Sequence, residues 1–395
     1  MNRRFLLLST VALFGLSVLV GTAKAADDLV IGVSMNRTGP LSANGTTTDM
    51  DVQMAIDDIN TKGGVNGKKL RAVVFDTAGD PKQAAVATRQ FAEDDKALAI
   101  VGPFSSGEVR VAFPIGERDG IVQVSNASSA PGLTKGFTFA FRNTTDELIQ
   151  FERLLKVMKD KGLTPKNVGV IYASDDFISK SLGTAVFPTA LKGADIPISA
   201  SIGFPLQGFD VSAQVADLKQ ASPDAVAIGG TVEAVIKVVR EMRRQGLQSR
   251  MLTSGVAADP HIAEKLGPDG NGSLYPTYYY HKLNDKVLEF QKRFAAETAK
   301  HGISKTIPQH ADVSAYDIVY LLAEAMRRAH VTGDEAKLTG ERAAIRDELH
   351  QTKSWNFEGV IGREYFDENG EAHMPTYIIE IENGDFKLLE TVPAQ

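Results

Sequence analysis

The sequence predicts an α/β protein made of two doubly wound parallel-sheet lobes. Short β-branched runs alternate with longer amphipathic segments along most of the chain, a pattern typical of parallel strands joined by right-handed helical crossovers. With 395 residues, the chain is too long for one ordinary core and fits two lobes. Because no proline- or serine-rich linker separates two halves, we expect several chain crossings between the lobes.

The first 25 residues have the order of a secretory signal. Arg3 and Arg4 precede an apolar run over residues 5–20, and Ala23-Lys24-Ala25 follows with small residues where a signal peptidase reads. The run is short for a membrane span, so an uncleaved anchor is the less favoured alternative. We expect cleavage after Ala25 and a soluble protein outside the inner membrane.

Composition excludes several classes of protein. Hydrophobic residues make up 43% of the chain and charged residues 23%, as in a globular protein. The formal charge of −6 argues against a nucleic-acid partner. The chain has no cysteine, so disulfides, thiolate chemistry and cysteine-based metal sites are excluded.

The periodicity places the elements in order along the chain. In the first part we expect strands at 29–35, 70–76, 98–101 and 122–124, and helices at 48–62, 81–94 and 107–119. Gly63-Gly64-Val65-Asn66-Gly67 is expected to end the first of these helices.

A second series of alternating elements begins near residue 145. We expect helices at 148–161, 179–191, 211–220 and 232–245, strands at 168–172, 197–202, 225–228 and 251–253, and long helices at 283–300, 313–329 and 341–351. The tail over 357–389 should form hairpins, because Asn369-Gly370 and Asn383-Gly384 separate short strands. The predicted first lobe comprises 26–147 and 278–353, and the second comprises 148–277 and 354–395.

Ligands of doubly wound sheets bind where strands end and helices begin. Three loops fit that position: residues 38–45 with Asn44, residues 102–107 with Phe104, Ser105 and Ser106, and residues 125–131 with Ala127, Ser128 and Ser129. Serine hydroxyls and free N–H groups at helix starts suit a carboxylate. The structural alternative is that Ser106 and Ser129 only cap helices.

Enzyme motifs fail in this sequence. Residues 102–107 have glycines at P-loop spacing but continue with Glu108-Val109 rather than lysine and serine or threonine. A G-x-S-x-G elbow and an H-E-x-x-H motif are also absent, and no nucleophile–base pair is legible. We therefore expect no catalytic residues, no metal and no cofactor, with a hydrolase as the rival class.

Some polar and aromatic residues have structural and functional interpretations. Tyr278-Tyr279-Tyr280 is expected in a strand that sends Tyr278 and Tyr280 to one face, with core packing as the favoured role for at least two of them. His310 starts a long helix, and Arg142 is more simply an ion-pair partner than a ligand.

Taken together, these loops resemble the periplasmic binding proteins of branched-chain amino acid type (leucine/isoleucine/valine-binding-like) that serve ABC importers. The resemblance spans the mature chain and rests on Ile31-Gly32, Thr38-Gly39-Pro40, Ala55-Ile56-Asp57-Asp58-Ile59-Asn60, the glycine-rich turn, Val101-Gly102-Pro103, Ser129-Ala130-Pro131 and Tyr316-Asp317. It implies a periplasmic, type I binding protein whose lobes close on a ligand about a three-crossover hinge.

The resemblance also implies site residues. Ser106 and the loop from Ala127 to Ser129 match positions that hold the ligand carboxylate, and Phe177 matches a second-lobe aromatic that covers the ligand. This chain has Thr231 where amino-acid binders place another aromatic, and Gly255 where they place the acid for the ligand ammonium. The glycine is expected to make room, while Glu233 or Asp176 could replace the missing acid.

The sequence therefore predicts a non-enzymatic solute receptor for a small carboxylate. Without an acid for an ammonium group, an aromatic acid of benzoate or hydroxycinnamate type is the favoured ligand. Phe104 and Phe177 would sandwich its body, and Tyr278 or His310 would bond a distal polar group. The alternatives are a branched-chain amino acid or amide, and a sensor that feeds a receptor kinase. We expect a monomer that docks a membrane permease.

Overall fold

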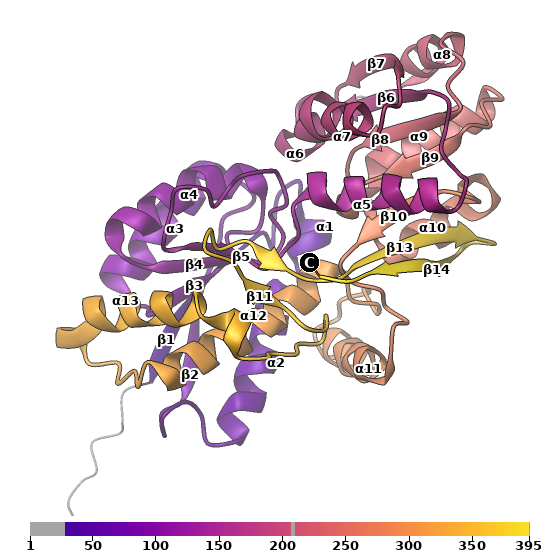
Figure 1. Ribbon diagram of the computed structural model, residues 1–395. Helices are drawn as coiled ribbons and strands as arrows, with labels where there is room; N and C mark the ends of the chain where they lie inside the picture. The colour runs from indigo at the N-terminus through magenta and orange to yellow at the C-terminus, as the bar shows by residue number, and fades with distance from the viewer. Residues whose placement is uncertain (1–27, 207–209, 395) are drawn as a thin grey trace, which may run out of the picture.

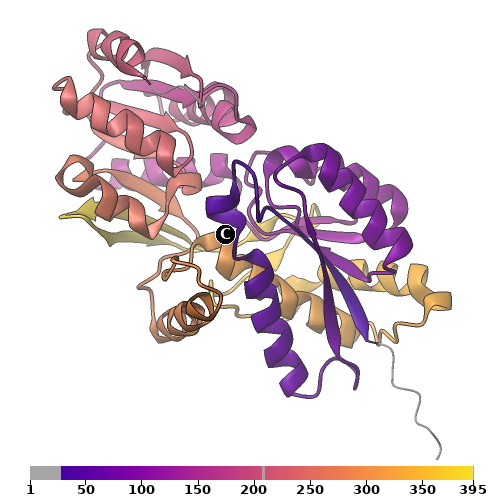
Figure 2. The same cartoon turned by 180° about the vertical axis from the view of Figure 1, so that it is seen from behind.

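The protein has two α/β lobes joined side by side, as the computed structural model shows (Figure 1). The structure describes residues 28–206 and 210–394. The predicted export signal and its cleavage site lie outside these residues. Seen from behind, the same two lobes are joined along one edge (Figure 2).

The first lobe contains a fully parallel sheet in the order β2-β1-β3-β4-β5. Its strands are β1 (Leu29–Met35), β2 (Leu70–Asp76), β3 (Ala99–Val101), β4 (Val122–Ser125) and β5 (Ala140–Arg142). Its helices are α1 (Ser42–Gly45), α2 (Thr48–Thr61), α3 (Pro81–Arg89), α4 (Ser106–Asp119), α11 (Asp285–Lys300), α12 (His310–Arg328) and α13 (Leu338–Leu349). Buried side chains of α2, α12 and α13 cover one face, and those of α3 and α4 cover the other. The lobe is therefore doubly wound.

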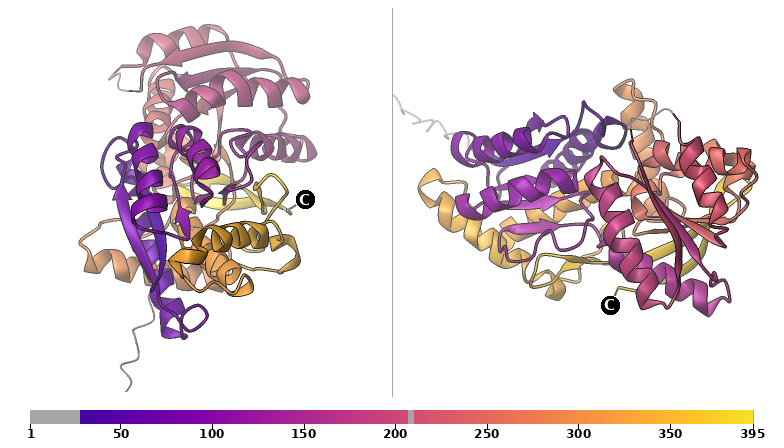
Figure 3. Two further views of the ribbon diagram at one scale, coloured as in Figure 1. Left: turned by 90° about the vertical axis from the view of Figure 1, so that its left-hand side faces the viewer. Right: turned by 90° about the horizontal axis from the view of Figure 1, so that it is seen from above.

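The second lobe contains a mixed sheet in the order β14-β13-β10-β9-β8-β6-β7. Its strands are β6 (Val168–Ala173), β7 (Ile198–Phe204), β8 (Ala225–Gly229), β9 (Arg250–Thr253), β10 (Leu274–Thr277), β13 (Thr376–Glu382) and β14 (Asp385–Val392). Its helices are α5 (Glu147–Asp160), α6 (Phe177–Ser181), α7 (Phe187–Gly193), α8 (Ser212–Gln220), α9 (Val232–Arg244) and α10 (Pro260–Leu266). Only β13 and β14 run antiparallel to their neighbours, and α8, α9 and α10 pack on the face opposite α5 and α7 (Figure 3).

The chain crosses between the lobes three times, as expected for the hinge. The crossings run from β5 to α5, from β10 to α11, and from the short hairpin β11 (Tyr365–Phe366) and β12 (Ala372–His373) to β13. The last crossing differs from the sequence-based boundary at residue 354. Phe366 and Met374 pack in the core of the first lobe, whereas Tyr377 packs in that of the second. The boundary shifts because the segment before β13 is apolar enough to complete the first core.

The three consecutive tyrosines lie beyond the end of β10, not within a strand. Tyr278 and Tyr279 pack into the first-lobe core, and Tyr280 packs into the second. The predicted alternation is therefore wrong, because the chain passes from one lobe to the other at this point. All three side chains are buried, so the expectation of core packing is confirmed.

The glycine-rich turn ends α2 as expected, and its residues explain why. Gly64 has φ +75°, and a Cβ there would lie 2.0 Å from the Lys68 carbonyl oxygen. The Asn66 amide donates hydrogen bonds to the carbonyls of Met326 and Val331, at 3.1 and 3.0 Å. The turn therefore ties α2 to the end of α12 in the first-lobe core.

Candidate functional site

A cavity of about 430 Å³ lies between the lobes, a size typical of small-molecule sites. It is formed where strands of both sheets end and the next helices begin, as expected for doubly wound sheets. Of the twelve residues predicted from the sequence to bind the ligand, eight line it: Phe104, Ser105, Ser106, Ala127, Ser129, Phe177, Thr231 and His310. The lining also contains Pro40, Leu41, Gly79, Pro81, Gly107, Asp175, Asp176, Ile178, Leu206, Val256 and Ala311.

The two serines at the start of α4 have different roles. The Ser105 side chain accepts a hydrogen bond from the Glu108 N–H and forms a capping box with Glu108. The Ser106 hydroxyl oxygen instead accepts the N–H groups of Ser129 and Ala130, both at 3.2 Å. Ser106 therefore connects the second and third loops, and its hydroxyl proton remains available to a ligand.

Buried Glu108 fixes this wall of the cavity from behind. Its carboxylate accepts hydrogen bonds from the Ser105 hydroxyl at 2.6 Å, the Asn36 amide at 3.2 Å and the Thr77 hydroxyl. Asn36 and Thr77 follow β1 and β2. One carboxylate thus holds the loops after three neighbouring strands, while the first N–H groups of α4 have no partner within the helix.

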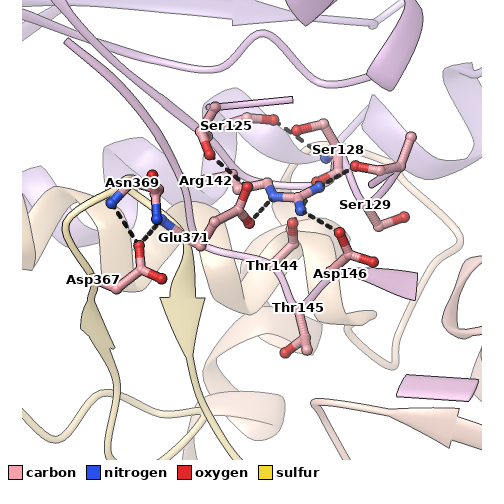
Figure 4. Close-up of polar contacts among 12 residues, drawn as sticks. Ser125, Ser128, Ser129, Arg142, Thr144, Thr145, Asp146, Asp367, Asn369 and Glu371 are labelled. Carbon is pink, nitrogen blue, oxygen red and sulfur yellow. Dashed lines mark hydrogen bonds and ion pairs between the residues drawn. The ribbon is translucent and has the colours of Figure 1, made fainter. Parts of the chain in front are cut away.

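Arg142 supports the third loop, and its surroundings are drawn in Figure 4. Its guanidinium donates to the Ala130 carbonyl at 2.5 Å and pairs with Asp146 at 3.0 Å and with Glu371. The side chain is fully buried. The expectation that Arg142 is an ion-pair partner is therefore confirmed, and the pair joins β5 to the tail of the chain.

Ser128 lies behind the cavity wall, not in it. Its carbonyl accepts the Thr144 hydroxyl, and its N–H donates to the Ser125 hydroxyl at 3.2 Å. Ser128 is buried and does not contact the cavity, so its role is to shape the loop that presents Ser129.

The second lobe supplies a wall with fewer polar ties to its surroundings. Asp176 caps α6 by accepting the Ser179 N–H at 2.9 Å, and Thr231 precedes α9. The Phe177 side chain is 38% exposed, and the Arg110 guanidinium of α4 lies 4.8 Å from its ring centre. This contact crosses from one lobe to the other at the edge of the cavity.

His310 and Tyr278 lie together, but only His310 reaches the cavity. The two rings meet edge to face with centres 5.0 Å apart. Burial lowers the pKa of His310 to about 4, so its imidazole is neutral at pH 7. Tyr278 is buried behind it and packs in the first-lobe core.

Gly255 does not open space for a ligand, contrary to the expectation from sequence. It is buried outside the cavity lining, and a Cβ there would lie 2.7 Å from Gln150 Oε1. The room left by the missing side chain is therefore filled by Gln150 of α5. The side chain of Asn44 lies outside the part of the chain that the structure describes.

The two acids suggested as replacements differ in position. Asp176 lines the cavity together with Asp175, whose carboxylate accepts the Leu206 N–H at 2.6 Å. Glu233 is exposed and lies outside the cavity lining, in a different depression between α9 and the residues just before α8.

Sequence reasoning missed Glu147 and several apolar lining residues. Glu147 begins α5 and is buried behind Ser129, and burial raises its pKa to about 8. In the sequence, only its place just before the helix expected at 148–161 marked it. Leu206 and Val256 follow β7 and β9, so the rule that ligands lie at strand ends could have found them.

The described residues contain neither a metal-binding cluster nor a membrane-spanning helix. No group of three or more histidine, aspartate or glutamate side chains there is placed to hold a metal ion. Within the same residues, none of the helices has the length and apolarity needed to cross a membrane.

The chain has extensive similarity to known proteins. Residues 28–385 match the family described as Periplasmic binding protein. An amino acid binding protein of Pseudomonas aeruginosa is 25% identical over 385 residues, 96% of each chain. The leucine binding protein LivK of Thermotoga maritima has a TM-score of 0.77 and 26% identity, covering 92% of this chain and 99% of its own.

A further solved structure shares the fold at lower identity. It is a solute binding protein of R. palustris in complex with benzoate, with a TM-score of 0.77 and 18% identity over 93% of this chain and 98% of that one. The family match covers most of the chain, and both lobes have the expected topology. The chain therefore belongs to the periplasmic binding proteins, the non-enzymatic solute-binding components of ABC transporters.

Proposed function

We propose that this protein captures a small aromatic carboxylate, of benzoate or hydroxycinnamate type, by closure of its lobes and delivers it to a membrane permease. The observation that carries the proposal is the cavity between the lobes, which Ser106 lines together with Phe104 and Phe177. The ligand favours the closed form through its higher affinity for that form.

The carboxylate anchor lies on the first lobe. Ser106 offers a hydroxyl proton, and the first turn of α4 offers N–H groups at the positive end of the helix dipole. No lysine or arginine belongs to the described cavity lining. Hydrogen bonds to an ionised acceptor contribute about 1.5–3 kcal/mol each, enough for an anchor without a cationic side chain.

The body of the ligand would lie against apolar surfaces from both lobes. Phe104 is a rigid wall on the first lobe, and Phe177 with Leu206 faces it from the second. Aromatic rings prefer offset-stacked or edge-to-face partners, which two phenylalanines on opposite walls can supply. The neutral imidazole of His310 can donate a hydrogen bond to, or accept one from, a hydroxyl group at the far end of the ligand.

A branched-chain amino acid or amide is the alternative ligand. It is favoured by Asp175 and Asp176, because a carboxylate in the lining could meet an ammonium group. Each already accepts a hydrogen bond from within its own lobe. The shared fold does not separate these ligands, since one structural relative is a leucine binding protein and another was solved with benzoate.

The setting of the function follows from the family. We propose that the chain is exported, cleaved after Ala25 and acts in the periplasm as a monomer, without a nucleic-acid partner or a cofactor. A sensor that feeds a receptor kinase would bind the same ligand without supporting its uptake. Loss of uptake in a strain lacking this protein would separate transport from sensing.

A thermal-shift screen of ligand-stripped mature protein tests the ligand class. The panel holds benzoates, hydroxycinnamates, branched-chain amino acids and short amides. Ligand at a hundred times its dissociation constant adds about 2.7 kcal/mol and raises Tm by several degrees. We expect a shift with aromatic acids and none with amino acids. A shift with leucine or valine alone would reject the aromatic-acid proposal.

A further inference from the structure

Glu147 lies where the two walls of the cavity meet, although it lines neither. It is the first residue of α5, directly after the first crossing, and its side chain is buried. Its Oε2 accepts the Gly255 N–H of the second lobe at 3.3 Å. Its backbone N–H donates to the carbonyl of Ser129, a first-lobe residue of the cavity lining, at 3.0 Å, and the Ser129 hydroxyl lies against its carboxyl. It therefore contacts both lobes.

The charged groups that face Glu147 do not supply a free cation. Asp146, the N-cap residue of α5, adds negative charge, and Tyr278 faces Glu147 from the second crossing. Arg142 of β5 is the cation nearby, but its guanidinium already pairs with Asp146 and Glu371. The Gly255 N–H and the Ser129 hydroxyl, both neutral, are a poor replacement for the water that surrounds an ionised carboxylate in solution.

This placement matters for a ligand anchored on Ser106 and Ser129. A ligand carboxylate there lies one hydroxyl away from Glu147, whose own carboxyl is buried. At this short separation and away from bulk water, an ionised Glu147 and a ligand carboxylate repel strongly. A protonated Glu147 adds no negative charge beside the ligand. An ammonium group would have the opposite effect, because it would favour the ionised form of Glu147.

We propose that Glu147 is a positioning residue that selects the charge of the ligand, keeping its proton when the cleft holds a carboxylate. This inference rests on the proposed function. Glu147 acts through Ser129 and does not itself touch the ligand: its protonated carboxyl can donate to the Ser129 hydroxyl oxygen, which leaves the Ser129 proton for the ligand carboxylate. At a pH where the ligand-free protein has lost this proton, each bound carboxylate takes one proton from solvent. The burial that raises the pKa of Glu147 to about 8 puts this change between pH 7 and pH 9.

Calorimetric titration with benzoate, in buffers of different ionisation heats, measures the linked proton. We expect little proton uptake at pH 7, uptake approaching one proton per benzoate at pH 9, and about tenfold weaker binding at pH 9 than at pH 7. Glu147→Gln is fixed in a neutral form, so its affinity should not change over this range. Glu152→Gln, an exposed position on the same helix, should keep the wild-type profile.

Each result decides the inference. Benzoate binding with no proton uptake at pH 9, or a pH profile unchanged by Glu147→Gln, overturns it while leaving the proposed function in place. Binding of leucine but not of benzoate rejects the proposed function, and proton release with leucine also overturns the role of Glu147.

A ligand-free measurement applies even if no compound on the panel binds. Infrared spectra of the ligand-free protein should contain a protonated carboxyl band at pH 7 that Glu147→Gln removes and Glu152→Gln keeps. An ionised Glu147 at pH 7 overturns the inference.

Discussion

The two walls of the cavity are held in different ways. On the first lobe, loops after neighbouring strands are bonded to one another through Glu108, Ser106 and Arg142. On the second lobe, Asp176 bonds within its own helix, and Phe177 remains partly exposed. The first wall thus joins the loops after several strands, whereas the bond from the Leu206 N–H to Asp175 on the second wall joins the loops after two. We therefore expect the second wall to adjust more readily to the body of the ligand.

This difference suggests how one fold serves several ligands. A carboxylate is common to amino acids and aromatic acids, so a fixed anchor can be retained while the opposite wall changes. In this chain the second-lobe wall, which would decide the choice of ligand, also has fewer described hydrogen bonds between its loops. Substitutions on the first wall should therefore affect stability and all ligands, and those on the second wall should affect ligand choice.

Removing Arg142 should have the largest effect. Arg142→Ala leaves Glu371 and Asp146 without their cation and frees the Ala130 carbonyl, so the free energy of unfolding should fall by about 3–5 kcal/mol in urea denaturation. Arg118→Ala, which removes an exposed pair with Asp119, should cost less than about 1 kcal/mol. Equal costs for the two variants would mean that the first wall does not depend on this ion pair.

Removing the Ser106 hydroxyl should weaken binding of every carboxylate ligand. Ser106→Ala loses a donor to the ligand and the acceptor for two N–H groups, so affinity measured by calorimetry should fall by about 1.5–3 kcal/mol. Asn284→Ala removes a helix cap far from the cavity and should cost about 1 kcal/mol of stability without changing affinity. Unchanged affinity in Ser106→Ala would remove Ser106 from the anchor.

Truncating Phe177 should separate ligands by their bodies. Phe177→Ala should weaken aromatic-acid binding by about 1 kcal/mol and barely change stability, because the ring is partly exposed. Leu388→Ala, at a similarly exposed apolar position on β14, should change neither property. The comparison fails if Phe177→Ala lowers stability as much as it lowers affinity.

A side chain at position 255 should lower the free energy of unfolding slightly, by an amount that depends on Gln150. Gly255→Ala places a methyl group against Gln150 Oε1 and should lower the free energy of unfolding by about 1 kcal/mol. Adding Gln150→Ala should recover part of this loss beyond additivity in a double-mutant cycle. Strict additivity would show that Gln150 does not occupy the space beside Gly255.

Regular patterning allowed most of the fold to be predicted. The strands β1 and β2 have the expected bounds, because their β-branched runs end at turn residues on both sides. The expected helix at 81–94 is α3 followed by a π-helical segment over Gln90–Asp94. By contrast, β5 is too short to show a period, and β10 contains Pro276, so neither was predicted. Local patterns also do not show which lobe's core a segment packs into. For this reason the last crossing was predicted at residue 354, although the chain crosses just before β13.

The site was predictable where the loop rule applied. The serine-rich loops after β3 and β4 reach the cavity because the carboxyl ends of parallel strands share one edge of the sheet. The spacing of residues along the sequence could not show that Ser128 and Tyr278 lie behind the cavity lining, because the side chains of neighbouring loop residues point in different directions. Nor could it show that Gln150 fills the space beside Gly255, because that contact joins residues far apart in the sequence.

The order of the chain crossings also constrains how the molecule assembles during synthesis. In the second sheet, Thr277 of β10 pairs with Tyr377 of β13, and α11, α12 and α13 of the first lobe lie between them in the sequence. The second lobe therefore cannot finish its sheet until almost the entire polypeptide has emerged. Pairings so distant in sequence form slowly. We therefore expect neither core to close until the last strands of the chain are in place.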